Sequence, residues 1–551
     1  MGMGIKRIPL LGGLALAVTV AWGPAALAQT SPGQVRDSLP TPTPQVPPPV
    51  RAPERPSDDG ATPSRAALNS PVQVSLQAFE FDGNTLFSTA VLAELLRSYL
   101  NRPLTLGDIY EAADGVERFY AEQGYPLTSV IVPPQKITVG KVLLQVVEAR
   151  VAAIRLEGNR RYRDSLLRAH LPDLEGGPYL EAPLEQGLYR LNDLPGLQAR
   201  AVIRPGTTFG TSDIVVRLRE RAVQGSLTVD NHGRDAIGEL RATGQLRVNN
   251  PLTLGDALTL SVLGSEDGLL TYGAIDYSLP LNSAGTRIEA YYGRAEYESD
   301  DVAPIEGSSE EARIGIRQAL VRSAGWHVDI RAGFSDVQSG VDLISANISD
   351  TEIKLFDIGM EALRRGPQGS TQLSVRASTD FQTLNRADLT PVNGSVEGHQ
   401  RLRLQVGALH HQNLTPRWLL LLRGTAVYSP DPLLDTQAFG LGGPGSVRGY
   451  PGSEYRGDQG FSAAIDVGYR LPLTGITVMP RLFVDGGFVR RVDLPAGQGD
   501  DQDDASSAGL GLDLHFRALS LTLDWAHPLQ DRVISDGETD GRMFGTLSLQ
   551  F

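Results

Sequence analysis

The sequence predicts two small α+β domains followed by an all-β transmembrane barrel of 16 antiparallel strands. Three observations support this fold class. An export signal is followed by no stretch apolar enough for a membrane-spanning helix, one order of strands and helices occurs twice in succession, and a long carboxyl-terminal region alternates apolar with polar residues. An exported chain without helical spans is either soluble or a β-barrel, because only helices and closed barrels satisfy the backbone inside a membrane.

The amino terminus carries the export signal. Lys6 and Arg7 precede an apolar run, which ends at an Ala-x-Ala site closing with Ala28. Residues 1–28 are therefore predicted to be a signal peptide. Residues 29–73 are rich in proline, a composition that favours an extended and semi-rigid linker.

Composition excludes several classes of function. The chain has no cysteine, so neither disulfides nor thiolate metal sites contribute. Its formal net charge of −14 argues against a nucleic-acid-binding protein, which normally shows a basic face. An acidic balance of this kind usually reflects a solvated surface.

Residues 74–150 and 151–221 are predicted to form two units with the same order of elements. Each opens with a strand, continues through a turn containing Gly-Asn and then two helices, and closes with two strands. Sheets of this size can bind an extended peptide at an exposed edge strand or in a groove between helix and strand. The alternative is that the two units are only spacers.

Residues 222–551 are predicted to form the barrel, because stretches of about ten alternating residues follow one another there. Leu240 and Leu246, for example, lie on the face opposite Arg241 and Arg247. A soluble barrel could not fill its core with so many charges, so the apolar face meets lipid and the polar face lines water. Short and long connections alternate, as short periplasmic turns and long external loops do in outer-membrane barrels. The first strand therefore begins and the last strand ends on the periplasmic side, which also places the two small domains in the periplasm. The long connections are predicted at residues 298–308, 337–351, 380–398, 429–457, 491–507 and 528–541.

The connection at residues 429–457 is unusual for an external loop. It is rich in glycine and proline, poor in charge and supplied with aromatic residues, so we expect it to fold into the lumen. At its centre stands the sequence Val447-Arg448-Gly449-Tyr450. The thirteenth predicted strand carries Phe483, Asp485 and Gly487, and its periodicity directs Phe483 and Asp485 to the lumen.

These motifs resemble those of a known superfamily of outer-membrane transporters. The Arg448 motif resembles the loop-six motif of the superfamily that contains BamA and the two-partner secretion transporters, and the Asp485 motif resembles its barrel-wall partner. Residues 120–148 resemble the first polypeptide-transport-associated (POTRA) domain of the haemolysin secretion and activation family. The POTRA residues that match are Pro134, Gln135 and Gly140. Phe551 ends the last strand and resembles the carboxyl-terminal assembly signal of outer-membrane barrels.

The resemblance implies a two-partner secretion transporter of the bacterial outer membrane with its POTRA domains in the periplasm. Such a protein recognises one large exoprotein, an adhesin, haemolysin or toxin, and passes it unfolded through the barrel. Arg448 would pair with Asp485 and latch the lumenal loop. The implied further partners are the barrel assembly machinery during biogenesis, and outer-membrane lipid and lipopolysaccharide. No enzymatic activity, cofactor or nucleic acid is expected.

The family commonly carries a plug helix before the linker. The candidate here runs from Gln34 to Leu39, is short, and is followed by Pro40. Residues 29–73 therefore contain a possible short plug helix, the sequence leaves open whether it plugs the barrel, and the loop is expected to do more of the sealing.

Three other functions remain open. An insertase of the BamA kind shares the loop motif but generally has more POTRA domains, and a passive porin would not need periplasmic domains. A barrel enzyme is disfavoured because no Gly-x-Ser-x-Gly elbow or convincing nucleophile and base are found. A large exoprotein encoded beside this gene would favour the two-partner secretion transporter over the insertase, the porin and the enzyme.

Several apparent sites are discounted. His410 and His411 are neighbours in a strand and face opposite sides, so no metal site is expected. The glycine-rich run from Gly442 to Gly449 lacks the Lys-Ser/Thr of a phosphate-binding loop. An acidic run lacks the pattern of a calcium loop and is predicted to be a solvated external loop, bridged to lipopolysaccharide by divalent ions. It consists of Asp500, Asp501, Asp503 and Asp504.

Overall fold

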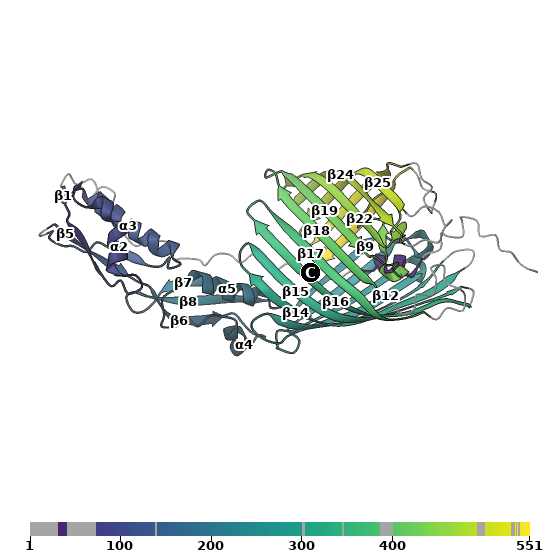
Figure 1. Ribbon diagram of the computed structural model, residues 1–551, viewed down its shortest axis with the longest axis horizontal. Helices are drawn as coiled ribbons and strands as arrows, with labels where there is room; N and C mark the ends of the chain where they lie inside the picture. Colours follow the sequence, from purple (N-terminus) through teal and green to yellow (C-terminus); the bar gives the residue numbers. More distant parts are fainter. Residues whose placement is uncertain are drawn as a thin grey trace, which may run out of the picture.

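A computed structural model describes residues 31–40, 73–137, 140–299, 304–343, 346–385, 400–492, 502–530, 535, 537 and 540–551. Two small domains lie in a row beside a large barrel (Figure 1). The predicted signal peptide and most of the predicted linker lie outside the described residues. In the described part of the chain, no helix is long and apolar enough to cross a membrane.

The first small domain packs a three-stranded sheet against two helices. Its strands have the order β2–β5–β4, with β2 parallel to β5 and β4 antiparallel to it. One apolar face of the longer helix, including Ile109, Val116 and Tyr120, is buried against the sheet. The elements are β1 (Val74–Ser75), β2 (Ala78–Asp82), α2 (Thr89–Leu95), η3 (Arg97–Tyr99), β3 (Pro103–Leu104), α3 (Leu106–Glu122), β4 (Ser129–Ile131) and β5 (Lys141–Val147).

The second small domain repeats this arrangement, with a parallel β6–β8 pair and an antiparallel β8–β7 pair. The repeat extends to single side chains. Glu148 and Glu220 end the two sheets, and each carboxylate accepts hydrogen bonds from the backbone of the turn that precedes the first helix of its domain. The elements are β6 (Arg150–Glu157), α4 (Asp164–Ala169), α5 (Glu181–Asn192), β7 (Leu197–Pro205) and β8 (Thr211–Glu220).

Glu220→Ala is expected to loosen the turn of the second domain. The Glu220 carboxylate accepts backbone hydrogen bonds from Arg160, Arg161 and Tyr162 at 3.0, 2.9 and 3.2 Å, and unpairing such groups costs roughly 1–3 kcal/mol. Hydrogen exchange at these three amides should therefore accelerate, whereas Glu157→Ala, at an exposed position, should leave it unchanged. Equal protection of these amides in both variants would contradict this assignment.

The remaining strands close into one antiparallel barrel, in which β27 pairs with β9. Because β23 continues β22, the barrel has the predicted 16 strands. The strands are β9 (Val223–Asp230), β10 (Arg241–Asn249), β11 (Ala257–Ser265), β12 (Leu270–Pro280), β13 (Thr286–Glu298), β14 (Ile305–Arg322), β15 (Trp326–Leu343), β16 (Ala346–Gly366), β17 (Gly369–Asn385), β18 (Leu402–Asn413), β19 (Trp418–Tyr428), β22 (Gln459–Tyr469), β23 (Leu471–Leu473), β24 (Ile476–Arg490), β25 (Gln502–Phe516), β26 (Leu519–Pro528) and β27 (Arg542–Gln550).

The outer face of the barrel is apolar and the inner face polar, as the alternation predicts. Leu246, Leu482 and Leu510 are exposed on the outside, whereas Arg241 and Asp485 are buried on the inside. An apolar outer band is what a lipid-facing barrel needs. The outer face therefore identifies this domain as a membrane-spanning barrel.

Several predicted external loops are in fact continuations of strands. Strands β14 to β17 contain 18, 18, 21 and 17 residues, more than the roughly 9–11 that cross a membrane. The prediction was wrong because ladder hydrogen bonds need only backbone groups and continue where apolar alternation stops. Likewise Asp503 and Asp504 lie in β25, not in a loop, while Asp500 and Asp501 lie outside the described residues.

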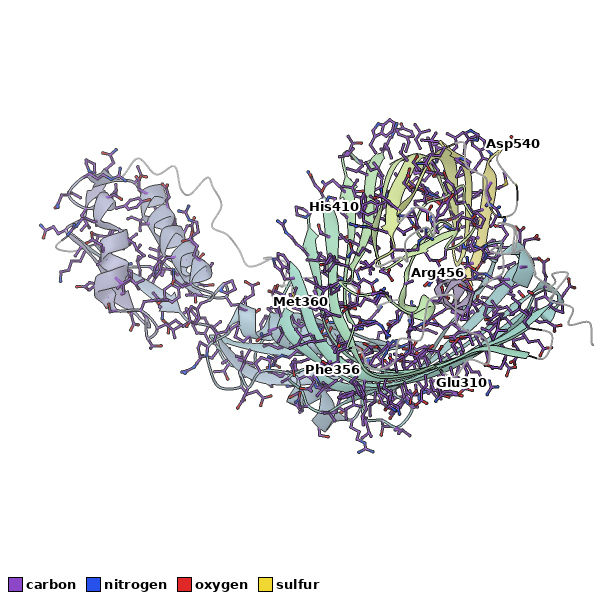
Figure 2. All side chains as sticks on the ribbon, turned by 45° about the vertical axis from the view of Figure 1, so that its right-hand side comes forward. Glu310, Phe356, Met360, His410, Arg456 and Asp540 are labelled. Atoms are coloured by element: carbon purple, nitrogen blue, oxygen red, sulfur yellow. The ribbon has the colours of Figure 1, made fainter. Side chains whose placement is uncertain are left out.

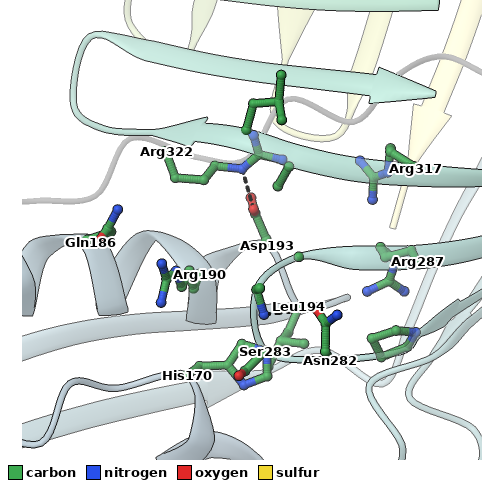
Figure 3. A pocket seen from close by; sticks show the side chains of 15 residues that line it. His170, Gln186, Arg190, Asp193, Leu194, Asn282, Ser283, Arg287, Arg317 and Arg322 are labelled. Atoms are coloured by element: carbon green, nitrogen blue, oxygen red, sulfur yellow. Dashed lines mark hydrogen bonds and ion pairs between the residues drawn. The ribbon is translucent and has the colours of Figure 1, made fainter.

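The second small domain contacts the periplasmic end of the barrel directly (Figure 3). Asp193, after α5, forms an ion pair with Arg322 of β14, which also pairs with Asp329 at 2.6 Å. Asn250, after β10, donates a hydrogen bond to the carbonyl oxygen of Arg161 at 3.2 Å. These contacts hold this domain at the mouth of the lumen.

His170, after α4, is expected to make this domain sensitive to acid. Burial lowers the pKa of its imidazole from 6.5, so the unfolded state binds a proton more readily than the folded state. Stability should be full above about pH 6.5 and fall as the pH drops toward the lowered pKa. Hydrogen exchange in α4 and α5 should increase over that interval, and His170→Gln should reduce the increase. An unchanged pH response in that variant would contradict the assignment.

Candidate functional site in the barrel lumen

The loop between β19 and β22 folds back into the barrel as predicted. It contains η6 (Asp435–Gln437), β20 (Phe439–Leu441) and β21 (Tyr455–Gly457), of which β20 and β21 form a small hairpin. Val447 and Tyr450 are fully buried and pack with side chains of the barrel wall. The Tyr450 hydroxyl donates a hydrogen bond to the Ser506 carbonyl oxygen at 3.2 Å. The loop is therefore part of the packed lumen.

Arg448 is the polar centre of this loop and is only 1% exposed. Its Nε and Nη2 each donate to the Asp485 carboxylate at 2.7 Å, and its backbone N–H donates to the same carboxylate at 3.0 Å. The guanidinium also lies 3.4 Å from the centre of the Phe483 ring, a cation–π contact. Side chain and backbone are thus both fixed to β24, with the bidentate geometry that arginine favours.

The structure adds carboxylates and a second arginine that sequence reasoning missed. Arg448 also pairs with Asp466 of β22 at 2.9 Å and with Asp524 of β26 at 3.4 Å. Arg481 of β24 bridges Asp466, Asp524 and Asp513 at 2.7 to 2.8 Å. All four wall residues alternate onto the lumenal face, so periodicity could have found them. Choosing them among the other lumenal charges requires the register between strands.

Two motif glycines have steric roles. Gly449 adopts φ of +93°, a left-handed conformation that side chains disfavour. A Cβ on Gly487 would stand 2.7 Å from Leu441 of the loop and 3.0 Å from the Cα of Ser462. Gly487 therefore leaves the space that lets the loop lie against β22 and β24.

The structure answers the question that the sequence left open, whether the amino-terminal helix plugs the barrel. Helix α1 (Pro32–Ser38) lies inside the barrel (Figures 1 and 2), and its Val35 is fully buried. Ser31 and Gln34 form a capping box at its start, and Pro32 suits the first helical position. Pro40 lies beyond its end and breaks nothing. The helix is short but gains its stability from the lumen around it.

An apolar seat on the lumenal wall receives Val35. It is formed by Ile237, Leu263, Leu270, Tyr272, Ala295, Tyr297, Ile305 and Val341. Polar contacts surround this seat. Arg36 pairs with Glu311 of β14 at 3.0 Å, and Arg241 of β10 donates to the Ser38 carbonyl oxygen at 2.7 Å. The helix is thus held by wall residues of several strands.

The same helix is also bound to the lumenal loop. Asp37 pairs with Arg456 at 2.5 Å, and the backbone N–H of Gly33 donates to Asp435 at 2.6 Å. Gln34 donates to the Ser453 carbonyl oxygen at 3.0 Å. In Figure 2, Arg456 lies inside the barrel, where these contacts form. Helix and loop therefore make one plug, anchored to the wall on two sides.

The POTRA motif residues all lie in the connection between β4 and β5 of the first sheet. The Gln135 side chain donates to the Leu143 carbonyl oxygen at 2.9 Å and accepts from the Leu143 N–H at 2.8 Å. It thereby extends the pairing that β4 gives to β5. Gly140 accepts at its carbonyl oxygen from the Gln77 N–H at 2.7 Å. Pro134 sits in the same connection. Gln135 thus contacts the central strand β5 and Gly140 contacts the residue before β2, while β2 and β4 remain the two edge strands of the sheet.

Phe551 lies at the seam where the barrel closes. Its N–H donates to the Gly225 carbonyl oxygen at 3.0 Å, and its carbonyl oxygen accepts from the Gly225 N–H at 2.9 Å. The ring itself is 66% exposed. The carboxyl-terminal residue therefore extends the pairing of β27 with β9, while its side chain stays on the surface.

Beneath the plug, on the side of the second small domain, lies a cavity of about 850 Å³. It is bounded by Asp193 and Leu197 of that domain, by Pro40 beside α1, and by the lumenal faces of strands between them. Within the described residues, no group of histidines and carboxylates could hold a metal ion. Most of the residues that line the cavity are polar or charged, and helix and loop close its outer end.

The fold and the lumenal site together define an outer-membrane transporter with periplasmic POTRA domains. The family model of the haemolysin secretion/activation protein ShlB/FhaC/HecB matches residues 210–515, and that of the POTRA domain, ShlB-type, matches residues 74–149. The chain therefore belongs to the ShlB/FhaC/HecB family of haemolysin secretion/activation proteins.

Individual relatives agree with this assignment. The hemolysin transporter protein ShlB of Serratia marcescens is 25% identical over 500 residues, which cover 87% of this chain and 84% of the relative. The outer membrane transporter CdiB of Escherichia coli is 24% identical over 445 residues, covering 78% and 73%. Among solved structures, CdiB from Escherichia coli matches with a TM-score of 0.66 at 23% identity, covering 89% and 93%. BamA from Haemophilus ducreyi lacking POTRA domains 1–3 matches with 0.55 at 16% identity, covering 87% and 100%.

Proposed function

We propose that this protein recognises a large exoprotein in the periplasm through its POTRA domains and passes it unfolded through the barrel to the cell surface. The observation that carries the proposal is the nature of the plug. Its loop and helix hold to the wall and to each other by many ion pairs and hydrogen bonds, with two small apolar clusters, one around Val35 and one around Val447 and Tyr450. Contacts of this kind can be exchanged for contacts with a passing polypeptide.

The first POTRA domain offers a place for the client to bind. Strand β2 is an edge of its sheet, and α2 lies beside it. An extended segment could add to this edge through backbone hydrogen bonds, as peptides do in β-augmentation. The other edge strand, β4, has only three residues against the five of β2, so β2 offers the longer edge to the client.

Arg448 acts as the latch in this proposal. Removing a buried arginine from its carboxylates costs far more than breaking a surface pair, which contributes about 0–1 kcal/mol. The client would offset that cost by occupying the lumen, and folding outside the cell would draw it onward. The named relatives include transporters of hemolysin and of heme/hemopexin, which supports an exoprotein as the client.

Two further partners complete the proposal. The barrel assembly machinery would recognise the carboxyl-terminal strand ending in Phe551 during biogenesis. Outer-membrane lipid would surround the apolar band, and lipopolysaccharide would meet the acidic residues at the outer end of β25, bridged by divalent ions. No catalytic step is part of this function.

The test is export of the exoprotein encoded beside this gene. Cells lacking the gene should retain that exoprotein in the periplasm, and the wild-type gene should restore its export. Unchanged export, together with a fall in general barrel assembly or small-solute uptake, would overturn the proposal in favour of an insertase or a porin.

A further inference from the structure

A row of arginines crosses the lumenal wall from strand to strand. Arg287 of β13 stands directly opposite Arg317 of β14, and Arg317 stands opposite Arg331 of β15. Gly359 of β16 follows in the same line, and Arg376 of β17 stands opposite it. Strands β14 to β17 lie side by side in the barrel (Figure 1), and Figure 3 shows Arg287 and Arg317 near the periplasmic end. Like charges placed directly opposite each other destabilise a sheet, so the row needs an explanation.

Arg287 is buried, but the carboxylates beside the row leave the other three arginine side chains partly open to the cavity. Arg317 pairs with Glu289 and Arg331 with Glu361, each at 3.0 Å, and three of the row's arginine side chains remain between 26 and 36% exposed. These three are Arg317, Arg331 and Arg376. A guanidinium carries five donors and one carboxylate takes at most two in a bidentate pair. Donors therefore remain for a further acceptor in the lumen.

Bare backbone lies immediately beside the arginine row. In the adjacent lumenal row, Gly315 of β14 stands opposite Gly333 of β15, and both line the 850 Å³ cavity. A Cβ on Gly333 would stand 3.2 Å from the Ile314 carbonyl oxygen. Glycine inside a strand often marks a place where another backbone approaches closely. This wall thus combines a flat strip of backbone with a line of cations.

We propose that the arginine row, with the Gly315–Gly333 strip, binds an acidic segment of polypeptide in extended conformation on its way through the lumen. The proposal rests on the transport function above and adds the chemistry of the segment that is bound. Glutamate and aspartate side chains of the segment accept from the arginines, while its backbone lies over the glycines. The neighbouring carboxylates limit the strength of this contact, so that the segment can move on.

The experiment measures binding of a fluorescent oligoglutamate peptide to the full-length protein in detergent. The wild type should bind this peptide in preference to an oligolysine of equal length, with an affinity that falls as salt rises. The variant R317Q/R331Q/R376Q should bind the oligoglutamate at least about tenfold more weakly than the wild type, because several partly exposed charge contacts are lost. Equal binding of the two peptides by the wild type would overturn the proposal.

Two controls keep the result specific. R97Q/R155Q/R294Q removes the same charge from arginines that are 77, 64 and 51% exposed and should bind as the wild type does. R317K/R331K/R376K keeps the cations and should stay within a few-fold of the wild type, which tests the row even if the glutamine variant fails to fold. A loss of affinity as large in the first control as in the glutamine variant would overturn the proposal. A wild type that exports its exoprotein but shows no preference for oligoglutamate would overturn this inference alone.

Discussion

Arg448→Ala is expected to abolish export of the exoprotein while the barrel still assembles. The substitution removes every side-chain contact of the latch and leaves Asp485 buried with its principal partner gone. Orphaning one partner of a buried pair costs roughly 3–5 kcal/mol. The free-energy cost of this substitution is reduced because Asp466 keeps its ion pair with Arg481. The loop should leave the wall, because its backbone contact with Asp485 alone is too weak to hold it.

Two quantities are measured: the amount of exoprotein exported, and the shift in gel mobility on heating, which shows that the barrel is folded. Arg294→Ala, at an exposed position on the outer face, is the matched control and should leave both unchanged. Arg448→Lys keeps the charge but not the fork geometry and should restore export only in part. Failure of Arg448→Ala to assemble would show that the pair is purely structural, and normal export would exclude a latch.

Val35→Asp is expected to expel the helix and open the pore. The Val35 side chain is fully buried in the apolar seat, and an unpaired carboxylate there costs several kcal/mol. Single-channel conductance in planar bilayers should rise, and cells should become sensitive to antibiotics too large for the closed barrel. Val35→Ala, which keeps the site apolar, should have a much smaller effect. Unchanged conductance in Val35→Asp would mean that the loop alone seals the lumen.

The sequence allowed the strand pattern to be predicted because lipid and water impose opposite demands on alternate residues. The same reasoning placed Phe483 and Asp485 on the lumenal face. It failed at the outer strand ends, where β14 to β17 continue beyond the membrane with polar residues on both faces. There the alternation disappears although the backbone pairing does not.

The place of helix α1 in the plug could not be predicted, because its contacts are distant in sequence. Arg241 is 203 residues from Ser38, and Arg456 is 419 residues from Asp37. From the sequence alone the segment from Gln34 to Leu39, directly before Pro40, is a weak helix, whereas in the structure the lumen stabilises the helix at Pro32–Ser38. The arginine row was equally hidden, since each arginine looks ordinary in its own strand and only the register aligns them.

The central claim is that an exoprotein travels through this lumen. Ser261 lines the cavity, while its neighbour Val262 is 60% exposed on the outer face of β11. A photo-crosslinking residue at each position, in cells carrying an exoprotein stalled during export, separates the two sides of one strand. Adducts with the exoprotein from position 261 and none from position 262 are the predicted result. Adducts from position 262 alone, or from neither position while the exoprotein is stalled, would contradict passage through the barrel.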